Sequence, residues 1–327
     1  MTARTDASSE ITAKPGILRT IRSYARLVKF QFVLDFYLAP IIAWTALAPL
    51  LKTDGETLVT LLFFALGQAG VLFAVMTLDD VTGIKDGSDR ANYLDANKTQ
   101  LRPLKRKPLL TGELTVAQAQ RYGYLSLVWG AGWWTAAILH TDHQQAWILV
   151  VTGLLLALSV QYSWGLKLSY YGLGELVLLF SAAAFLIAPY GLATGELPAL
   201  VLVEGLLFGF GQLMIAGYSN TNDIDGDKSA GRRTVAVLTS GTRHGNVIFL
   251  GLLTAANILV ILVPTLAGWV PWWLPIALLP AIVLRLRQYG GFVRNPQAPL
   301  VARIRGVLVF RTTVVCVLAV NIVYIGF

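Results

Sequence analysis

The sequence predicts an all-α membrane protein, a polytopic bundle of about nine transmembrane helices. The first indication is composition: of 327 residues, 55% are hydrophobic and only 13% are charged. A soluble domain carries roughly 25% charged residues, so water is not the expected solvent of this chain. The second indication is the recurrence of apolar runs close to the ~20 residues that a helix needs to cross a bilayer. The third is the distribution of lysine and arginine, which fits one orientation in the membrane.

Nine apolar segments are predicted to span the bilayer, and short polar connections alternate with two long ones at 79–116 and 222–244. The predicted spans are 30–51, 57–78, 117–138, 145–163, 172–194, 197–221, 245–265, 270–286 and 303–326. Residues 1–25 are expected to be a cytoplasmic tail, because they lack the apolar core of a signal peptide. Residues 26–327 are then a single membrane domain.

The basic residues predict the orientation. With the N-terminus in the cytoplasm, the outward connections (52–56, 139–144, 195–196 and 266–269) contain only one lysine or arginine, Lys52. The other 25 of the 26 fall on the inner side, as the positive-inside rule requires. The C-terminus is then outside. This topology, with attraction to anionic lipids, accounts for the net charge of +8, so we expect no nucleic-acid partner.

Acidic residues concentrate in two short stretches of the long inward loops, residues 76–89 and 217–234, which together hold seven of the chain's 18 carboxylates: Asp79, Asp80, Asp86, Asp89, Asp223, Asp225 and Asp227. Asp223 and Asp227 are four residues apart and share a face of any helical continuation of the sixth span. Asp79 and Asp86 are seven apart and also share a face. Neighbouring carboxylates repel unless a cation lies between them, and oxygen-only ligands suit Mg²⁺. The two loops therefore predict a magnesium site facing the cytoplasm.

The two halves of the chain form a weak internal repeat. Each acidic cluster ends a span and is followed by basic residues and then a Thr-Gly or Thr-Ser-Gly element. The period is four helices, so the repeats have the same orientation and are related by an axis along the membrane normal. We therefore expect two four-helix repeats plus a ninth helix around a central cavity. Such a cavity would bind a diphosphate at the metals and a prenyl chain among the helices.

Other polar residues complete the predicted site. Lys107, Lys228 and Arg233 follow the acidic clusters and are candidates to stabilise the charge on a departing diphosphate. Asp35 lies within the first span, and ionisable groups at that depth are functional by default. Asp35 and Asn222 are candidates for the cavity wall.

At this point the chain resembles the UbiA superfamily of intramembrane prenyltransferases over residues 25–325. The resemblance rests on three motifs in order: KPLLTG at 107–112, YSWGLKLSYYGLGE at 162–175 and NDIDGDKSAGRRT at 222–234. It implies Mg²⁺-dependent ionisation of a prenyl diphosphate and capture of the allylic cation by an aromatic or other small acceptor. By position, Asp223 and Asp227 would bind one Mg²⁺, and Asp79 with Asp86 or Asp80 the other. Lys107, Lys228, Arg233 and Tyr162 would contact the diphosphate.

The first acidic motif departs from the pattern of this superfamily, which is N-D-x-x-D-x-x-x-D. With Asp79 aligned, Leu78 replaces the asparagine and Thr82 the middle acid. Relatives with an altered first motif include terpene cyclases, in which the substrate's own double bonds capture the cation. Transferase and cyclase therefore both stay open. A cation-coupled transporter is disfavoured, because transporter ion sites lie near the midplane and these acids cluster at one membrane face.

Overall fold

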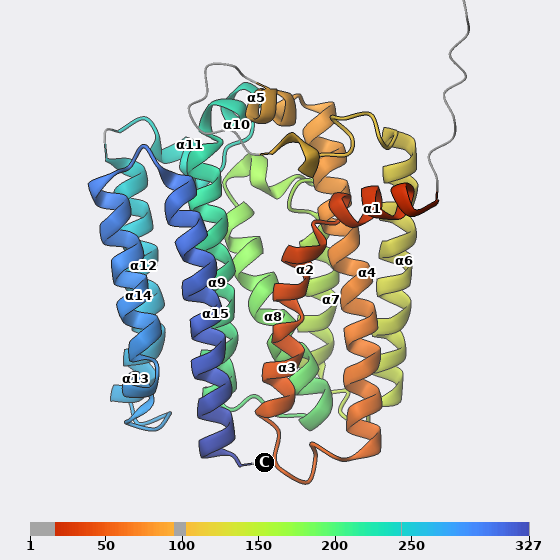
Figure 1. The fold of residues 1–327 in the computed structure, drawn as a ribbon. Helices are drawn as coiled ribbons and strands as arrows, with labels where there is room; N and C mark the ends of the chain where they lie inside the picture. Colours follow the sequence, from red (N-terminus) through yellow and green to blue (C-terminus); the bar gives the residue numbers. More distant parts are fainter. Residues whose placement is uncertain (1–16, 95–102, 243, 327) are drawn as a thin grey trace, which may run out of the picture.

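The structure is a computed structural model that describes residues 17–94, 103–242 and 244–326. In these residues the chain forms helices and no β-strand, as the sequence predicts. The long helices run side by side along one axis, and shorter helices gather at one end of the bundle (Figure 1).

Each predicted span coincides with one helix or with a broken pair of helices. In chain order these are α2 (Phe30–Phe36) with α3 (Leu38–Thr45), α4 (Gly55–Lys85), α6 (Val116–His140), α7 (Ala146–Val160), α8 (Gly174–Thr194), α9 (Ala199–Asn222), α12 (Gly245–Leu266), α13 (Leu274–Ala277) with α14 (Leu279–Arg294), and α15 (Pro299–Tyr324). Five of the described helices are long and apolar enough to cross a membrane: α4, α8, α9, α12 and α15. The number is six if α1 (Ile17–Leu27) and the segment α2–α3, which meet at a bend of 51°, together make one span. The membrane-type helical bundle is thus confirmed, whereas the number nine stays a prediction.

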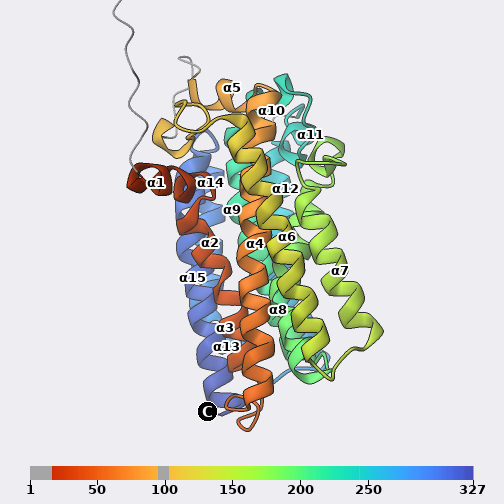
Figure 2. The same ribbon diagram turned by 90° about the vertical axis from the view of Figure 1, so that its right-hand side faces the viewer.

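Close helix packing in the first half depends on glycine. A Cβ atom at Gly70 would collide with the Ser126 carbonyl of α6, and one at Gly130 would collide with the backbone of Val71 on α4. Small residues at such contacts let two membrane helices approach backbone to backbone, where dispersion contacts rather than the hydrophobic effect hold them together. α4 and α6 therefore form a tightly packed pair on one side of the bundle (Figure 2).

The break between α2 and α3 follows from Pro40. Proline has no N–H, so the carbonyl of Phe36, four residues earlier, loses its intrahelical donor. The side-chain amide of Gln68 on α4 donates to this carbonyl at 2.8 Å, which satisfies it inside the bundle. The first span is therefore broken, but the carbonyl that loses its intrahelical donor still has a hydrogen-bond partner, as a membrane interior requires.

Four short helices lie at one end of the bundle, whereas the short helix α13 and the C-terminal end of α15 lie toward the other (Figure 1). The four are α1, α5 (Ser88–Leu94), α10 (Ile224–Ser229) and α11 (Val235–Thr239). α1 crosses the bundle at this end and presents Ile17, Leu18 and Ile21 as exposed apolar residues, a pattern typical of a helix lying in the membrane interface. The predicted tail 1–25 thus includes most of α1 from residue 17 onward, and its first sixteen residues lie outside the described part.

Candidate active site

A cavity of about 240 Å³ opens among the helices at the end that carries α5 and α10. Its mouth is strongly charged and its inner wall is apolar. The charged lining residues are Lys29, Asp79, Asp89, Arg106, Lys107, Asp223, Asp227, Arg232 and Arg303, and the apolar ones include Phe32, Phe36, Leu72, Val75, Met76, Val177, Leu178, Phe185 and Ile215. Both acidic loops therefore contribute to one cavity with an ionic end and a hydrocarbon-like end.

The second acidic loop continues the direction of α9. α9 ends at Asn222, but the Asp227 amide still donates to the Asp223 carbonyl at 2.9 Å, a helix-type bond that leads into α10. This turn places both carboxylates at the cavity wall, where only 9% of Asp223 and 5% of Asp227 is exposed. The Asn222 amide supports Asp223 by donating to its carboxylate at 3.0 Å, but Asn222 does not line the cavity. The spacing of four residues thus has the predicted structural consequence.

α5 and α10 bring the two loops into direct contact. Gly226 of α10 lies against the side chain of Asn92 on α5, and a Cβ atom at this glycine would collide with the Asn92 amide. The close approach requires a residue without a side chain. The second loop is therefore packed against the first over the cavity mouth.

Arg232 joins the two acidic loops by charge. After α10 the chain reverses at Gly231, which adopts φ +74°, and the Arg232 amide then donates to the Asp227 carbonyl at 2.8 Å. The guanidinium reaches across to the first loop, 3.0 Å from the Asp86 carboxylate and 3.7 Å from that of Asp79. One cation thus bridges the two acids that were expected to share a face.

Two lysines neutralise the rest of the first loop. Asp80 is fully buried, and its carboxylate lies 2.8 Å from the Lys107 ammonium and 3.1 Å from that of Lys29. Lys107 also pairs with Asp89 at 2.8 Å, and Lys29 with Asp79 at 3.3 Å. Lys29 sits in the break between α1 and α2 in a left-handed backbone conformation, φ 52°. Such a conformation is rare for a residue with a side chain and is a form of strain found at functional sites.

Burial and crowding of carboxylates alter the acid–base properties of this mouth. Burial raises the pKa of Asp227 to about 7. The positive charge of Arg232 lowers this pKa only in part, and the negative charges of nearby carboxylates raise it further; these are Asp223, Asp79 and Asp86. Burial also raises the pKa of Asp89 to about 6 despite its lysine partner. A divalent cation would relieve this repulsion.

The donor set fits Mg²⁺ bound together with a phosphate ligand. Four carboxylates line the cavity, those of Asp79, Asp89, Asp223 and Asp227, and Asp89 is paired with Lys107. Mg²⁺ commonly takes one or two carboxylates and fills its shell with water and substrate phosphate. Among the described residues, no three acids, histidines or cysteines already form a closed metal cluster. The residues are therefore suited to an open site that a diphosphate completes.

A family model identifies the chain from its sequence. The model of the UbiA prenyltransferase family matches residues 37–304. This chain belongs to the UbiA prenyltransferase family. No curated protein matches the sequence.

Solved UbiA-type structures share the fold. Digeranylgeranylglyceryl phosphate synthase aligns with a TM-score of 0.63 at 11% identity, over 93% of this chain and 99% of that one. A UbiA homologue from Archaeoglobus fulgidus bound to DMAPP and Mg²⁺ aligns with 0.61 at 15% identity, over 90% and 99%. The apo UbiA homologue from Aeropyrum pernix K1 aligns with 0.58 at 15%, over 89% and 96%.

Some residues that the UbiA resemblance pointed to do not line the cavity. Lys228 and Arg233 are exposed, and Arg232 takes the place expected of Arg233. Asp86 lies outside the lining, paired with Arg232 and with the Tyr170 hydroxyl.

Two further predicted residues differ in the same way. Asp80 is buried behind the wall with Lys29 and Lys107, and Asp35 pairs with Arg311 of α15 at 3.0 Å instead of facing the cavity. Tyr162 does line the cavity, and its ring packs against Gly174 at the start of α8.

The UbiA-like glutamate of the GLGE element, Glu175, has a tethering role. Its carboxylate accepts hydrogen bonds from the Asn220 side-chain amide and from the backbone N–H of Val235, both at 3.1 Å. These bonds hold the start of α8 to the end of α9 and to the segment after Arg232. Glu175 thus fixes the backbone on which the second acidic loop is built.

Sequence reasoning missed Lys29 and Arg232 as site residues. The positive-inside rule already accounts for Lys29, and of the three basic residues after the second acidic cluster the sequence analysis chose Lys228 and Arg233 over Arg232. For Arg232, the signal available in the sequence is Gly231, since a left-handed glycine after a short helix reverses the chain. For Lys29, no pattern in the sequence marks the break between α1 and α2 as an active position.

Proposed function

We propose that this UbiA-family protein is an Mg²⁺-dependent intramembrane prenyltransferase that ionises a prenyl diphosphate and transfers the prenyl group to an aromatic or other small acceptor. The observation that carries the proposal is the single cavity with carboxylates and cations at one end and apolar rings at the other. Structures of the A. fulgidus homologue bound to DMAPP and Mg²⁺, and to GPP and Mg²⁺, support this choice of ligands.

In this proposal, Asp79, Asp223 and Asp227 hold the metal, because they line the cavity and, unlike the fourth lining acid, Asp89, they are not paired with Lys107. Bound Mg²⁺ would supply Lewis-acid stabilisation of the charge that develops on the departing diphosphate. The role of Asp86 and Asp80 is then to hold cations rather than metal, since neither lines the cavity and each pairs with arginine or lysine.

Lys29, Lys107 and Arg232 are proposed to bind the diphosphate oxygens. All three line the cavity and are paired with first-loop carboxylates, so each is held in place before substrate arrives. A diphosphate would exchange carboxylate contacts for charge-assisted contacts to phosphate. Cations arranged in advance around the leaving group stabilise it without reorganisation during the reaction.

The apolar end of the cavity is suited to the prenyl chain and to its cation. Phe36 and Phe185 are nearly fully buried, and their rings, with that of Phe32, line the wall. Phe36 contacts Phe185 edge to face, with ring centroids 5.7 Å apart. Aromatic faces stabilise cations, and a dry wall protects an allylic cation from water.

The proposed reaction breaks the C–O bond between the prenyl carbon and the diphosphate, and the bonding electron pair leaves with the diphosphate oxygen. An electron pair of the acceptor then forms the new bond to the prenyl carbon, and the acceptor loses a proton. In the cyclase alternative, a double bond of the substrate supplies that electron pair, and no acceptor is consumed.

Acceptor-free incubation tests the proposal. Purified protein with Mg²⁺ is given C10 to C25 prenyl diphosphates, with and without a panel of aromatic acceptors, and diphosphate release and products are measured. We expect product only when an acceptor is present and no turnover after chelation of Mg²⁺. A cyclic terpene formed without acceptor would replace the transferase by the cyclase, and metal-independent turnover would overturn the metal assignment.

We also propose that the cavity mouth faces the cytoplasm, with the N-terminus on the same side and the C-terminus outside. The support is the distribution of lysine and arginine in the sequence. An Asp225→Cys variant places a thiol on an exposed position of α10. It should react with a membrane-impermeant reagent in inverted vesicles only, and reaction in right-side-out vesicles would reverse the orientation.

A further inference from the structure

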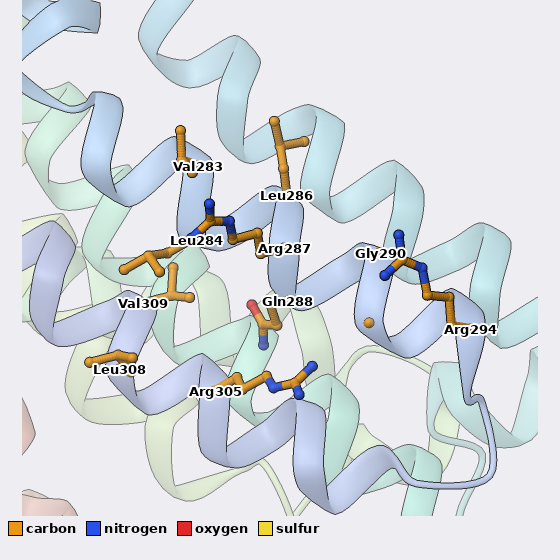
Figure 3. A pocket seen from close by; sticks show the side chains of 11 residues that line it. Val283, Leu284, Leu286, Arg287, Gln288, Gly290, Arg294, Arg305, Leu308 and Val309 are labelled. Atoms are coloured by element: carbon orange, nitrogen blue, oxygen red, sulfur yellow. The ribbon is translucent and has the colours of Figure 1, made fainter.

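A groove of about 740 Å³ lies between α14 and α15, away from the catalytic cavity. Figure 3 shows the side chains that line it on the two helices, with Leu284, Leu308 and Val309 toward one end and Arg294 toward the other. The groove is lined by Val283, Leu284, Leu286, Arg287, Gln288, Gly290, Gly291, Arg294, Arg305, Leu308 and Val309. No residue of this lining belongs to the catalytic cavity. The groove therefore needs an explanation of its own.

The charge of this region is one-sided. From residue 228 to the C-terminus the sequence contains ten lysines and arginines but no aspartate or glutamate. The net charge of +8 therefore resides entirely in the last hundred residues, because acids slightly exceed bases in the rest. In the described part of the chain, no ion pair joins Arg287, Arg294 or Arg305 to a carboxylate. Three cations thus surround a groove that lacks an internal counter-charge.

The floor of the groove is held by buried hydrogen bonds and by close contacts at two glycines. Only 1% of Gln288 is exposed there. Its side-chain N–H donates to the Ala302 carbonyl at 2.9 Å, and its side-chain oxygen accepts from the buried Arg285 guanidinium at 2.6 Å. Gly306 leaves room for this amide, because a Cβ atom there would collide with it. Gly291 likewise leaves room for the guanidinium of Arg305. Two glycines on facing helices therefore admit one polar and one cationic group.

The groove walls match a chain of hydrocarbon. Val283 and Leu286 of α14 and Leu308 of α15 are exposed, and α15 is long and apolar enough to cross a membrane. Arg287 and Arg294 are seven residues apart and share one face of α14, beside Arg305 of α15. Arginine binds phosphate through paired donors in a fixed fork. A molecule that fits both features carries an anionic phosphate and acyl chains.

We propose that the groove between α14 and α15 is a binding site for an anionic phospholipid, with its phosphate at Arg294 and Arg305 and an acyl chain along Leu284 and Leu308. The lipid supplies the counter-charge that the last hundred residues lack. Because the groove shares no lining residue with the catalytic cavity, this site is independent of the proposed reaction.

Native mass spectrometry of the full chain released from nanodiscs tests the site. Nanodiscs contain phosphatidylcholine alone or mixed with phosphatidylglycerol, and retained lipids are counted. We expect phosphatidylglycerol to be retained in preference to phosphatidylcholine. Arg305→Gln should weaken this retention about tenfold, the effect of losing one charge-assisted phosphate contact. Arg121→Gln is the matched control, since Arg121 is an exposed arginine on α6 outside the groove, and it should retain the lipid as the unaltered protein does.

A second variant keeps every charge. Gly291→Val fills the space under Arg305 and should weaken retention as much as Arg305→Gln, with an unchanged elution profile showing that the variant is folded. Soluble glycerol 3-phosphate should not displace the lipid, because it lacks acyl chains. Equal retention in the two groove variants and the unaltered protein, equal retention of both lipid types, or displacement by glycerol 3-phosphate would each overturn the proposal.

Discussion

The two acidic loops of this UbiA-family protein look alike in sequence but differ in what surrounds their carboxylates. In the first loop, all four acids pair with cations: Asp79, Asp80, Asp86 and Asp89 contact Lys29, Lys107 or Arg232. In the second loop, Asp227 faces the cavity without an ion pair among the described residues, and its pKa is raised to about 7 by burial. We infer that the first loop mainly positions cations and that the second loop, together with Asp79, binds the metal.

This difference explains why the first motif tolerates an unusual sequence. A carboxylate that pairs with a lysine needs only its charge and a position within ion-pair distance of the ammonium. A metal ligand also needs a defined position in the coordination shell. Asp80 meets the first requirement from a fully buried position behind the wall. We infer that Asp79 alone of the first loop shares the metal, and the following predictions test that division.

The largest expected effect belongs to the second loop. Asp227→Asn should lower turnover of prenyl diphosphate about a thousandfold or more, since it removes a proposed ligand of the metal that would stabilise the departing charge. Asp225→Asn, two residues away and exposed, should leave turnover unchanged. Steady-state diphosphate release at saturating Mg²⁺ measures both. Comparable rates for the two variants would remove the distinction between cavity-facing and exposed acids.

Arg232 and Arg233 offer the next contrast. Arg232→Gln should reduce kcat/KM about a hundredfold, because it removes both a diphosphate contact and the bridge between the loops. Arg233→Gln and Lys228→Gln should change it little, as both side chains are exposed. Kinetics over a range of prenyl diphosphate concentrations separate the three. If Arg233→Gln proves the most harmful, the arrangement after Gly231 differs from the one described.

Asp80→Asn should act through its lysines. Removing one partner of a fully buried ion pair costs about 3–5 kcal/mol of stability. We therefore expect a lower thermal unfolding midpoint together with a raised KM for prenyl diphosphate, as Lys29 and Lys107 lose their anchor. Asp89→Asn, which affects only Lys107, should show a smaller shift of both. A changed Mg²⁺ requirement at constant KM would instead make Asp80 a metal ligand.

The smallest effect is expected outside both loops. Asp35 pairs with Arg311, whose side chain is 59% exposed, and such pairs contribute about 1 kcal/mol or less. Asp35→Asn should therefore lower the unfolding midpoint slightly and leave turnover unaltered. A large loss of activity with normal stability would place Asp35 in the reaction after all.

Much of this architecture can be predicted from local sequence patterns, and the rest depends on tertiary contacts. Hydropathy locates the helices, but α14 continues to Arg294, well beyond the predicted end at 286, because arginines lower the hydropathy without breaking the helix. The spacing of Asp223 and Asp227 predicts their shared wall. By contrast, the choice of Arg232 over Arg233 depends on the direction of one turn, and the role of Lys29 on a break between helices. Neither can be computed from residue type alone.

Metal binding itself is the most direct test of the division between the loops. Mn²⁺ can replace Mg²⁺ as a spin probe, and its binding can be titrated by EPR in the presence of an unreactive prenyl thiolodiphosphate. We predict that Asp227→Asn weakens Mn²⁺ binding at least about tenfold, whereas Asp80→Asn leaves it within about twofold. Equal weakening in both variants, or loss in Asp80→Asn alone, would contradict the account of two loops with separate tasks.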